Sequence, residues 1–118
     1  NVDYSNAMHA REVWQRDLAK IFLDVDIILS PTLPTLIPPV EEEKSLLEAT
    51  KDATRNTYAG AFGKLPGLSI PCGFTSDGLP AGLQLEASWW NEPLLLQVGA
   101  AFQRVTNWHT YKPKMAKI

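Results

Sequence analysis

The crowding of glycine and proline in one stretch constrains the fold of this chain more than any other sequence feature. Six of the seven glycines lie within residues 60–82, interleaved with three prolines. Neither residue type is favourable inside a helix, so this stretch predicts strands and turns. Residues 68–70 are typical of a strand, and the alternation over residues 81–87 predicts a second strand. Asp77-Gly78 supplies the positive φ of a tight turn between them, so we expect a hairpin.

Helical periodicity flanks this stretch on both sides. Apolar residues recur three or four positions apart over residues 6–23, with Ser5 or Asn6 as the N-terminal cap. The same spacing recurs over residues 93–108, with Asn91 as the cap. Both segments therefore predict helices that bury one face.

Three further segments complete the predicted order of elements. Residues 26–30 are short, apolar and β-branched, which predicts a strand buried on both faces. Four prolines make residues 31–39 an extended loop, and residues 41–58 read as a surface helix with an acidic start. The lysine-rich tail over residues 111–118 is expected to fray. We predict a single unit over residues 1–118 of α/β class, with a short mixed sheet, a hairpin and three flanking helices.

Charge and cysteine content narrow the classes of function. The 118 residues include 13 acidic and 11 basic side chains, a net charge of −2, and no clustered basic stripe, so we expect no nucleic-acid partner. No apolar run approaches about 18 residues, so we expect no membrane span. The single cysteine, Cys72, and the two histidines exclude an internal disulfide and a cysteine-rich zinc site. We expect no metal and no cofactor, and a lone cysteine fits a reducing, cytoplasmic location.

No set of residues predicts catalysis by this chain alone. A serine triad would need Ser69, Asp77 and His109, but Gly-Leu-Ser-Ile-Pro is not a nucleophile elbow. Cys72 has no adjacent helix start or basic residue that would activate its thiol, so we expect a buried cysteine at a strand end. The tryptophan pair at residues 89–90 is expected to cover an edge of the core.

Three sequence blocks carry a specific resemblance. They are Asp-Ile-Ile-Leu-Ser-Pro-Thr at residues 26–32, Leu-Pro-Gly-Leu-Ser-Ile-Pro-Cys-Gly at 65–73 and Gly-Leu-Pro-Ala-Gly-Leu-Gln at 78–84. In this order they closely resemble the C-terminal third of the amidase-signature family. That family includes aliphatic and aryl amidases, fatty-acid amide hydrolases and the A subunits of glutamyl-tRNA amidotransferases. The resemblance runs from Tyr4 through Pro113.

The resemblance implies a large α/β/α sandwich, of which this chain is the C-terminal part. It also implies hydrolysis of an amide C–N bond by a serine nucleophile, a second serine in a cis peptide and a lysine base. These three residues lie in the family's N-terminal half, and no residue of this chain corresponds to them, so we expect no catalytic residue here. We expect a fragment that is inert by itself and needs the N-terminal half of its parent amidase to act on a small amide. The chain begins with Asn1 rather than methionine, which favours the same expectation.

Three threonines are the substrate-binding residues that the resemblance implies. Thr32 and Thr35 would lie on the loop beyond the first strand, and Thr57 would belong to the pocket wall. Thr57 opens a segment that usually reads Thr-x-Pro-x-Asn-x-x-Gly-x-Pro in the family. Three of its positions are replaced here, by Ala59, Ala61 and Lys64. A lysine in place of glycine predicts a different loop conformation at that point.

The resemblance leaves three functions open. In the A subunits of tRNA amidotransferases, an acidic residue three positions before that threonine helps to hold glutamine, and the matching residue here is Thr54. This favours part of a small-amide hydrolase over the same region of an amidotransferase A subunit. The third alternative is a non-catalytic interaction module. If the elements that normally cover the strands are missing, exposed apolar surface and open strand edges predict self-association.

Overall fold

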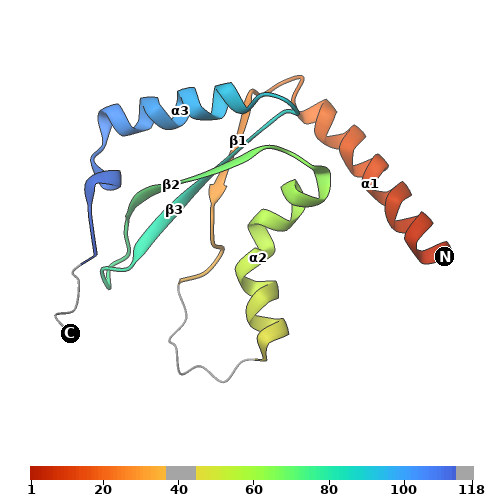
Figure 1. Ribbon diagram of the computed structural model, residues 1–118, viewed down its shortest axis with the longest axis horizontal. Helices are drawn as coiled ribbons and strands as arrows, with labels where there is room; N and C mark the ends of the chain where they lie inside the picture. Colours follow the sequence, from red (N-terminus) through yellow and green to blue (C-terminus); the bar gives the residue numbers. More distant parts are fainter. Residues whose placement is uncertain (37–44, 114–118) are drawn as a thin grey trace.

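A computed structural model describes residues 1–36 and 45–113 of the chain. It contains three helices, three strands and a short 3-10 turn (Figure 1). In chain order these are α1 (Val2–Ile21), β1 (Ile27–Pro31), α2 (Leu46–Gly63), β2 (Gly67–Phe74), β3 (Pro80–Ala87), α3 (Glu92–Val105) and the turn Trp108–Thr110. The predicted α/β class, the hairpin and the three helices are confirmed. No helix in the described residues is both long and apolar enough to cross a membrane.

The three described strands form one sheet in the order β1-β3-β2. Both pairings are antiparallel, with Leu29 opposite Leu85 and Leu68 opposite Leu85 in the register. We expected a mixed sheet, but no parallel pair exists among these strands. The hairpin turn closes through a 2.8 Å hydrogen bond from the Thr75 amide to the Leu79 carbonyl, and Gly78 has the expected positive φ, 79°.

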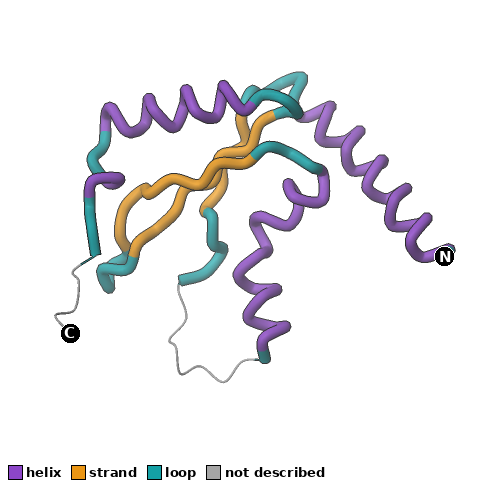
Figure 2. The backbone as a smooth tube through the Cα atoms, viewed as in Figure 1, coloured by secondary structure: helices purple, strands orange, loops and turns teal. Residues whose placement is uncertain are grey.

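Alternation along the strands gives the sheet two chemically different faces. Leucines at 83 and 85 lie on one face with Ile70 and pack against Leu95 of α3, which forms the core. Gln84 and Glu86 lie on the opposite face, toward α2. Figure 2 shows α3 and α2 on opposite sides of the strands. One face of the sheet is therefore buried within the chain, and the other is polar.

Side chains of α1 and of the segment after β3 bind the C-terminal end of α2. Trp14 donates its indole N–H to the Ala59 carbonyl at 2.9 Å. The Gln15 amide and the Trp89 indole both donate to the Gly63 carbonyl, at 3.0 and 2.9 Å. The last four carbonyls of a helix have no partner within the helix, so the Gln15 and Trp89 donors satisfy a Gly63 carbonyl that would otherwise remain free. They also fix the positions of α1 and Trp89 relative to α2.

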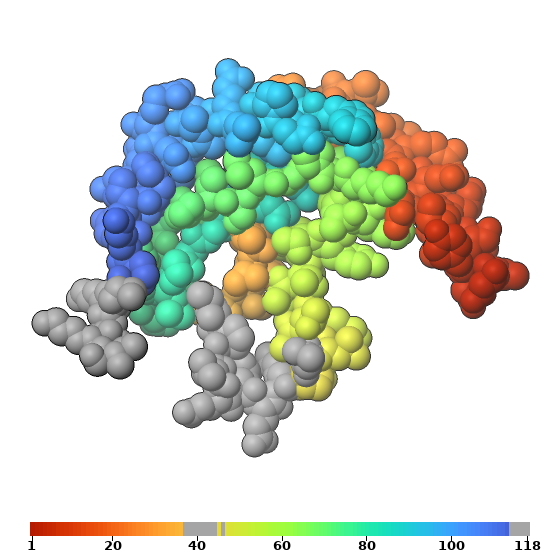
Figure 3. Space-filling model, in the orientation of Figure 1, coloured from red at the N-terminus to blue at the C-terminus, as the bar shows by residue number. Residues whose placement is uncertain are grey.

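The molecule is open rather than compact. Its radius of gyration is 17.3 Å, compared with roughly 13.5 Å for a compact domain of this length. Figure 3 shows α1 extending away from the body of the molecule. Few hydrophobic side chains are buried in the described residues: Leu18, Ile70, Leu85, Ala87 and Leu95. A core of this size is small for an independent domain.

The boundaries of the helices differ from the predicted ones. Helix α1 begins earlier than predicted, because Asn1 rather than Ser5 or Asn6 accepts a capping hydrogen bond, from the Asp3 amide at 3.1 Å. Asn91 lies at the N-cap of α3 as predicted, but its side chain makes no capping hydrogen bond. The predicted start of the second helix and the end of the proline-rich loop fall in residues 37–44, which lie outside the described residues. The tail from residue 114 also lies outside them.

Three burial predictions were wrong. Strand β1 is not buried on both faces, because it is an edge strand and the side chain of Leu29 is 62% exposed. Cys72 is only partly buried. Trp89 packs edge-on against Phe22, with ring centroids 6.5 Å apart, but Trp90 is 91% exposed and covers no core.

Candidate functional site

The polar face of the sheet contains a cavity of about 260 Å³. Its wall is formed by the segment after β1, by helix α2, and by strands β2 and β3. The lining residues include Thr32, Thr57, Ser69, Gln84 and Glu86. Thr32 and Thr57, which we expected on the pocket wall from the resemblance, therefore line the same cavity although 25 positions separate them in the sequence.

A pair of hydroxyl groups crosses the central strand at one end of this cavity. The Oγ1 atom of Thr32 lies 2.6 Å from the Oγ atom of Ser69, a hydrogen-bonding distance. The Thr32 amide donates to the Gly82 carbonyl at 2.9 Å, which holds this residue against β3. A Cβ atom on Gly82 would lie only 2.7 Å from the Thr32 hydroxyl oxygen. Glycine at position 82 is thus what allows the two hydroxyls to meet over the strand.

A second network holds α2 against the sheet. The side-chain amide of Gln84, itself buried, donates to the Asn56 carbonyl at 3.1 Å. The Asn56 side chain in turn donates to the Pro31 carbonyl at 2.8 Å. Buried polar groups are costly unless they are hydrogen-bonded, and here the bonds connect α2 to both β3 and β1. This network sets the separation between Thr57 and Thr32 across the cavity.

Glu86 brings a half-buried carboxyl group into the cavity wall. The space where a Cβ atom of Gly60 would lie is occupied by the Glu86 carboxyl group, so the glycine permits this close approach to α2. Burial raises the pKa of Glu86 above its ordinary value, and a hydrogen bond with the Gln84 side chain offsets part of that increase. No basic side chain forms an ion pair with Glu86 in the described residues.

Thr35, the third expected pocket residue, lies apart from the other two. It lines a separate hollow of about 320 Å³, formed by the proline-containing segment after β1 and by the tip of the hairpin. The structure thus brings Thr32 and Thr57 together and places Thr35 elsewhere. The role of all three in substrate binding stays a prediction.

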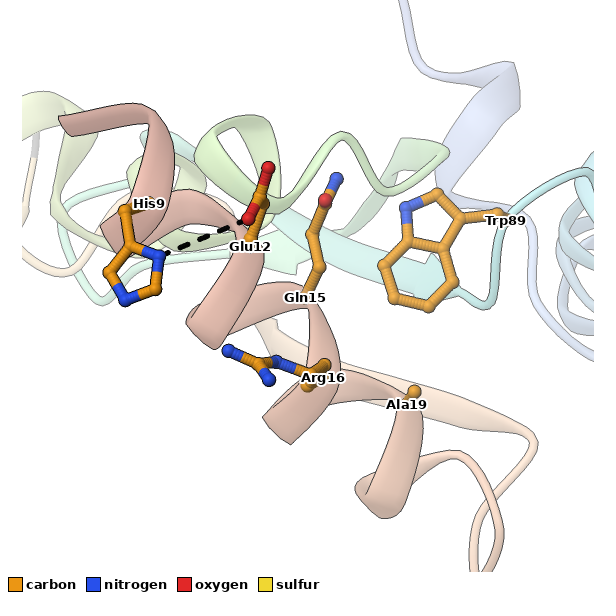
Figure 4. Close-up of a pocket in the computed structure, with 6 residues that line it drawn as sticks. All are labelled: His9, Glu12, Gln15, Arg16, Ala19 and Trp89. Carbon is orange, nitrogen blue, oxygen red and sulfur yellow. Dashed lines mark ion pairs between the residues drawn. The ribbon is translucent and has the colours of Figure 1, made fainter. Parts of the chain in front are cut away.

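A larger, shallow groove of about 710 Å³ runs along α1 (Figure 4). His9 and Glu12 lie 4.0 Å apart at one end and Trp89 lies at the other. All these groups are solvent-accessible or already bonded elsewhere, as Gln15 and Trp89 are to Gly63. None of the expected site residues lies in this groove.

The arrangement contains no assembled nucleophile and base. Ser69 bonds to Thr32, Asp77 accepts from Ser76 at 3.5 Å, and His109 is exposed. No hydrogen bond joins these groups into a triad within residues 1–36 and 45–113. The same residues contain no cluster of three side chains that could hold a metal ion.

Sequence reasoning missed Arg11. Its guanidinium carbon lies 5.2 Å from the centre of the Phe62 ring, a cation–π contact between α1 and α2. Its Nε atom is buried and has no hydrogen-bond partner in the described residues, while Nη1 reaches the Met8 sulfur at 3.8 Å. Nothing in the local sequence marks this arginine, because its environment depends on how the two helices pack.

Sequence reasoning also missed Gln84 and Glu86. A signal was present, because the alternation Leu83-Gln84-Leu85-Glu86 places both polar side chains on the face opposite the leucines. Their partners, Asn56 and Gly60, come from a helix whose position the alternation does not give.

Comparison with known proteins identifies the class. The Amidase family model matches residues 1–96, so the chain belongs to the amidase family. This confirms the resemblance that the three sequence blocks carried.

Its relatives include the A subunit of the glutamyl-tRNA(Gln) amidotransferase of Chloroflexus aggregans, 40% identical over 114 residues that cover 97% of this chain and 23% of that protein. The corresponding protein of Cupriavidus necator is 35% identical over 113 residues, 96% of this chain and again 23% of the relative. The chain thus spans about a quarter of the length of these relatives.

Solved structures show the same fold. A crystal structure of an amidase superposes with a TM-score of 0.74 at 27% identity, over 86% of this chain and 24% of the other. The A subunit of the glutamyl-tRNA(Gln) amidotransferase from Thermotoga maritima gives 0.62 at 28% identity, over 71% of this chain and 18% of that chain. A 6-aminohexanoate cyclic dimer hydrolase, at 23% identity, gives 0.77 over 93% of this chain and 25% of that one, a likeness of fold alone. The chain is a region of an amidase-type protein.

Proposed function

We propose that this chain is the C-terminal scaffold and pocket wall of an amidase-family hydrolase that cleaves C–N amide bonds. The observation that carries the proposal is the cavity of about 260 Å³ on the polar sheet face, whose described lining includes hydroxyl groups, a carboxyl group and apolar side chains but no lysine. The share of its relatives' length that the chain spans, 23%, supports a catalytic apparatus contributed by sequence outside these 118 residues.

The chemistry we propose for the complete protein is acyl transfer by two serines and a lysine. A neutral lysine accepts a proton through the second serine from the nucleophilic one, and backbone N–H groups hold the oxyanion of the intermediate. The residues described here take no part in the proton transfers. Their contribution is to form a wall at which a small amide substrate is held, with the threonines at 32 and 57 facing it.

The open architecture supports association with the rest of the parent protein. Strands β1 and β2 are both edges of the described sheet, and edge strands pair readily with further strands. Large apolar side chains are exposed on β1 and α3, including Leu29 at 62% and Leu96 at 64%. We infer that the N-terminal portion of the parent covers these surfaces. No cofactor enters this scheme, and the single free cysteine fits a cytoplasmic setting.

A second candidate function is the same region of a glutamyl-tRNA amidotransferase A subunit. The 40% identity to such a protein over nearly the whole chain favours it. Thr54 counts against it, because the resemblance places an acidic, glutamine-holding residue at this position of the A subunits. The two candidates share a scaffold and differ in the substrate that the pocket accepts.

Both candidates are tested by measuring amide hydrolysis with and without the rest of the parent. The purified chain is assayed against glutamine and a panel of small aliphatic and aryl amides, alone and after mixing with the separately expressed upstream portion. We expect no turnover by the chain alone and turnover by the mixture. Turnover restricted to glutamine would favour the amidotransferase. Turnover by the chain alone that disappears in Cys72→Ala would overturn the proposal, and His109→Ala serves as its matched control.

A further inference from the structure

The cavity on the polar sheet face has an unbalanced set of hydrogen-bonding groups. The Thr57 hydroxyl donates its proton to the Thr54 carbonyl at 3.1 Å, which leaves only acceptor lone pairs to face the cavity. The hydroxyls of Thr32 and Ser69 share one hydrogen bond, which uses one of their two protons. The Gln84 side-chain amide donates to the Asn56 carbonyl and also hydrogen-bonds to the Glu86 carboxyl group. Most donors of the wall are therefore already used, whereas acceptor capacity remains.

The Glu86 carboxyl group supplies the only charged hydrogen-bond acceptor among the described residues that line this cavity. It is half-buried, lies over Gly60 where any side chain would displace it, and projects from the central strand between β1 and β2. An ionised carboxylate accepts hydrogen bonds and donates none. Removal from water disfavours its charged form and raises the pKa of Glu86, and the one hydrogen bond from the Gln84 side chain offsets only part of that effect. No lysine, arginine or histidine lines this cavity in the described residues.

We propose that Glu86 determines substrate specificity in this pocket by receiving a primary ammonium group, with the Thr57 hydroxyl oxygen as a second acceptor. This inference rests on the proposed function, because it names the class of amide that the pocket takes: a small amide carrying an amino group at its other end. An ammonium group has three donors and a positive charge, which complements a carboxylate beside hydroxyl lone pairs. A cavity of about 260 Å³ accommodates a short aminoalkyl chain.

The same ammonium chemistry has a second source, a lysine from the upstream part of the parent. The two sources predict different outcomes. If the ammonium group comes from the substrate, loss of the Glu86 carboxylate should lower activity only toward substrates that carry the charge. If it comes from a lysine of the parent, the same loss should weaken assembly and lower activity toward every substrate equally.

The first measurement uses the full 118-residue chain and a small probe. Propylammonium chloride is titrated into isotope-labelled protein while the NMR signals of the Glu86 carboxyl carbon and the Thr57 methyl group are followed. We expect saturable shifts that are abolished in Glu86→Gln and absent with 1-propanol, the uncharged isostere. Glu92→Gln, the same substitution at an exposed carboxylate on α3, is the matched control and should leave binding unchanged. Absence of saturable shifts in the unmodified chain overturns the inference.

The second measurement uses the chain assembled with the upstream portion of its parent. The kcat/KM values for 4-aminobutanamide and for its uncharged counterpart pentanamide are compared. We expect Glu86→Gln to lower the first by roughly tenfold or more, the effect of losing one charge-assisted hydrogen bond, and the second by less than about threefold. An equal loss for both amides points to a parent lysine and overturns the inference. If the unmodified assembly hydrolyses neither amide, the proposed function fails for them, whereas the NMR titration still decides whether the cavity binds an ammonium group.

Discussion

Replacing Gly82 by alanine tests the arrangement of the cavity wall most directly. The added Cβ atom would lie 2.7 Å from the Thr32 hydroxyl oxygen, 3.1 Å from the Thr32 Cβ atom and 3.2 Å from the Ser69 hydroxyl oxygen. Non-bonded carbon atoms are most favourably placed about 3.5–4.0 Å apart, so at least one of these side chains must move. Movement breaks the 2.6 Å hydrogen bond between them.

The magnitude follows from three contributions. Forcing an extra methyl group into a packed position costs about 1–3 kcal/mol, and losing one hydrogen bond costs about 1 kcal/mol. Replacing glycine gains about 0.4–1 kcal/mol by restricting the unfolded chain. Because Thr32 is only partly buried and Ser69 is exposed, they have room to shift, which favours the low end of the first range. We expect Gly82→Ala to lower the free energy of unfolding by about 1–2 kcal/mol.

The measurement is urea unfolding followed by tryptophan fluorescence, with the same substitution repeated in a Thr32→Ala/Ser69→Ala background. In that background two of the three close contacts and the hydrogen bond are absent, so Gly82→Ala should cost much less. A coupling of about 1 kcal/mol between the sites is expected. If the loss is the same in both backgrounds within about 0.3–0.5 kcal/mol, the reasoning is refuted, because distant and independent sites behave additively.

Four further expectations concern single features of the chain. Lys64 has φ 60°, a left-handed conformation that costs a non-glycine residue about 1 kcal/mol, so Lys64→Gly should raise the melting temperature, and a decrease would contradict this backbone assignment. Gly78 has φ 79°, and no atom lies within 4 Å of where its Cβ atom would be. Gly78→Val should therefore lower the free energy of unfolding by about 1 kcal/mol through backbone strain alone, whereas Gly78→Asn should lower it less. Equal melting temperatures for the two variants would contradict the turn assignment. Because folding raises the pKa of Glu86, the folded state favours the protonated carboxyl group, and ionisation of this group lowers the free energy of unfolding as the pH rises above about 4.5. Glu86→Gln should therefore be more stable than the unmodified chain near about pH 7 but not near about pH 3. An equal difference in stability at both pH values would be evidence against burial of the carboxyl group. The exposed apolar side chains and two open sheet edges predict self-association of the isolated chain, which sedimentation would exclude by showing a strict monomer at high concentration.

Local features of the fold could be predicted from the sequence. The turn at Asp77-Gly78 depends on the backbone preference of one glycine, and the structure places that glycine at positive φ as expected. The antiparallel pairing of β1 with β3 could not be predicted in the same way. It joins Ile28 to Glu86, residues 58 positions apart, and no local preference fixes the direction in which so distant a strand pairs.

The same distinction applies to the residues that line the two hollows. Thr32 and Thr57 were expected from the resemblance and do line one cavity, whereas Thr35, three residues beyond Thr32, lies in another hollow because the chain turns away after β1. The expectation that Lys64 changes the loop conformation stays a prediction. Lys64 occupies the left-handed conformation that glycine ordinarily favours, which no propensity of lysine predicts. The contact between Glu86 and Gly60 depends on where α2 lies on the sheet.

The position of α2 depends on polar contacts rather than on the hydrophobic core. The buried core is formed by the leucine-bearing face of the sheet and by α3, and it contains no residue of α2. What connects α2 to the strands is the route from Gln84 to Asn56 to Pro31. Hydrogen bonds of this kind contribute modestly to stability, but they fix geometry, because their distances and angles tolerate little change. The chain therefore separates its two tasks: the apolar face supplies the stability of the sheet, and the polar face determines how far apart the groups that line the cavity are held.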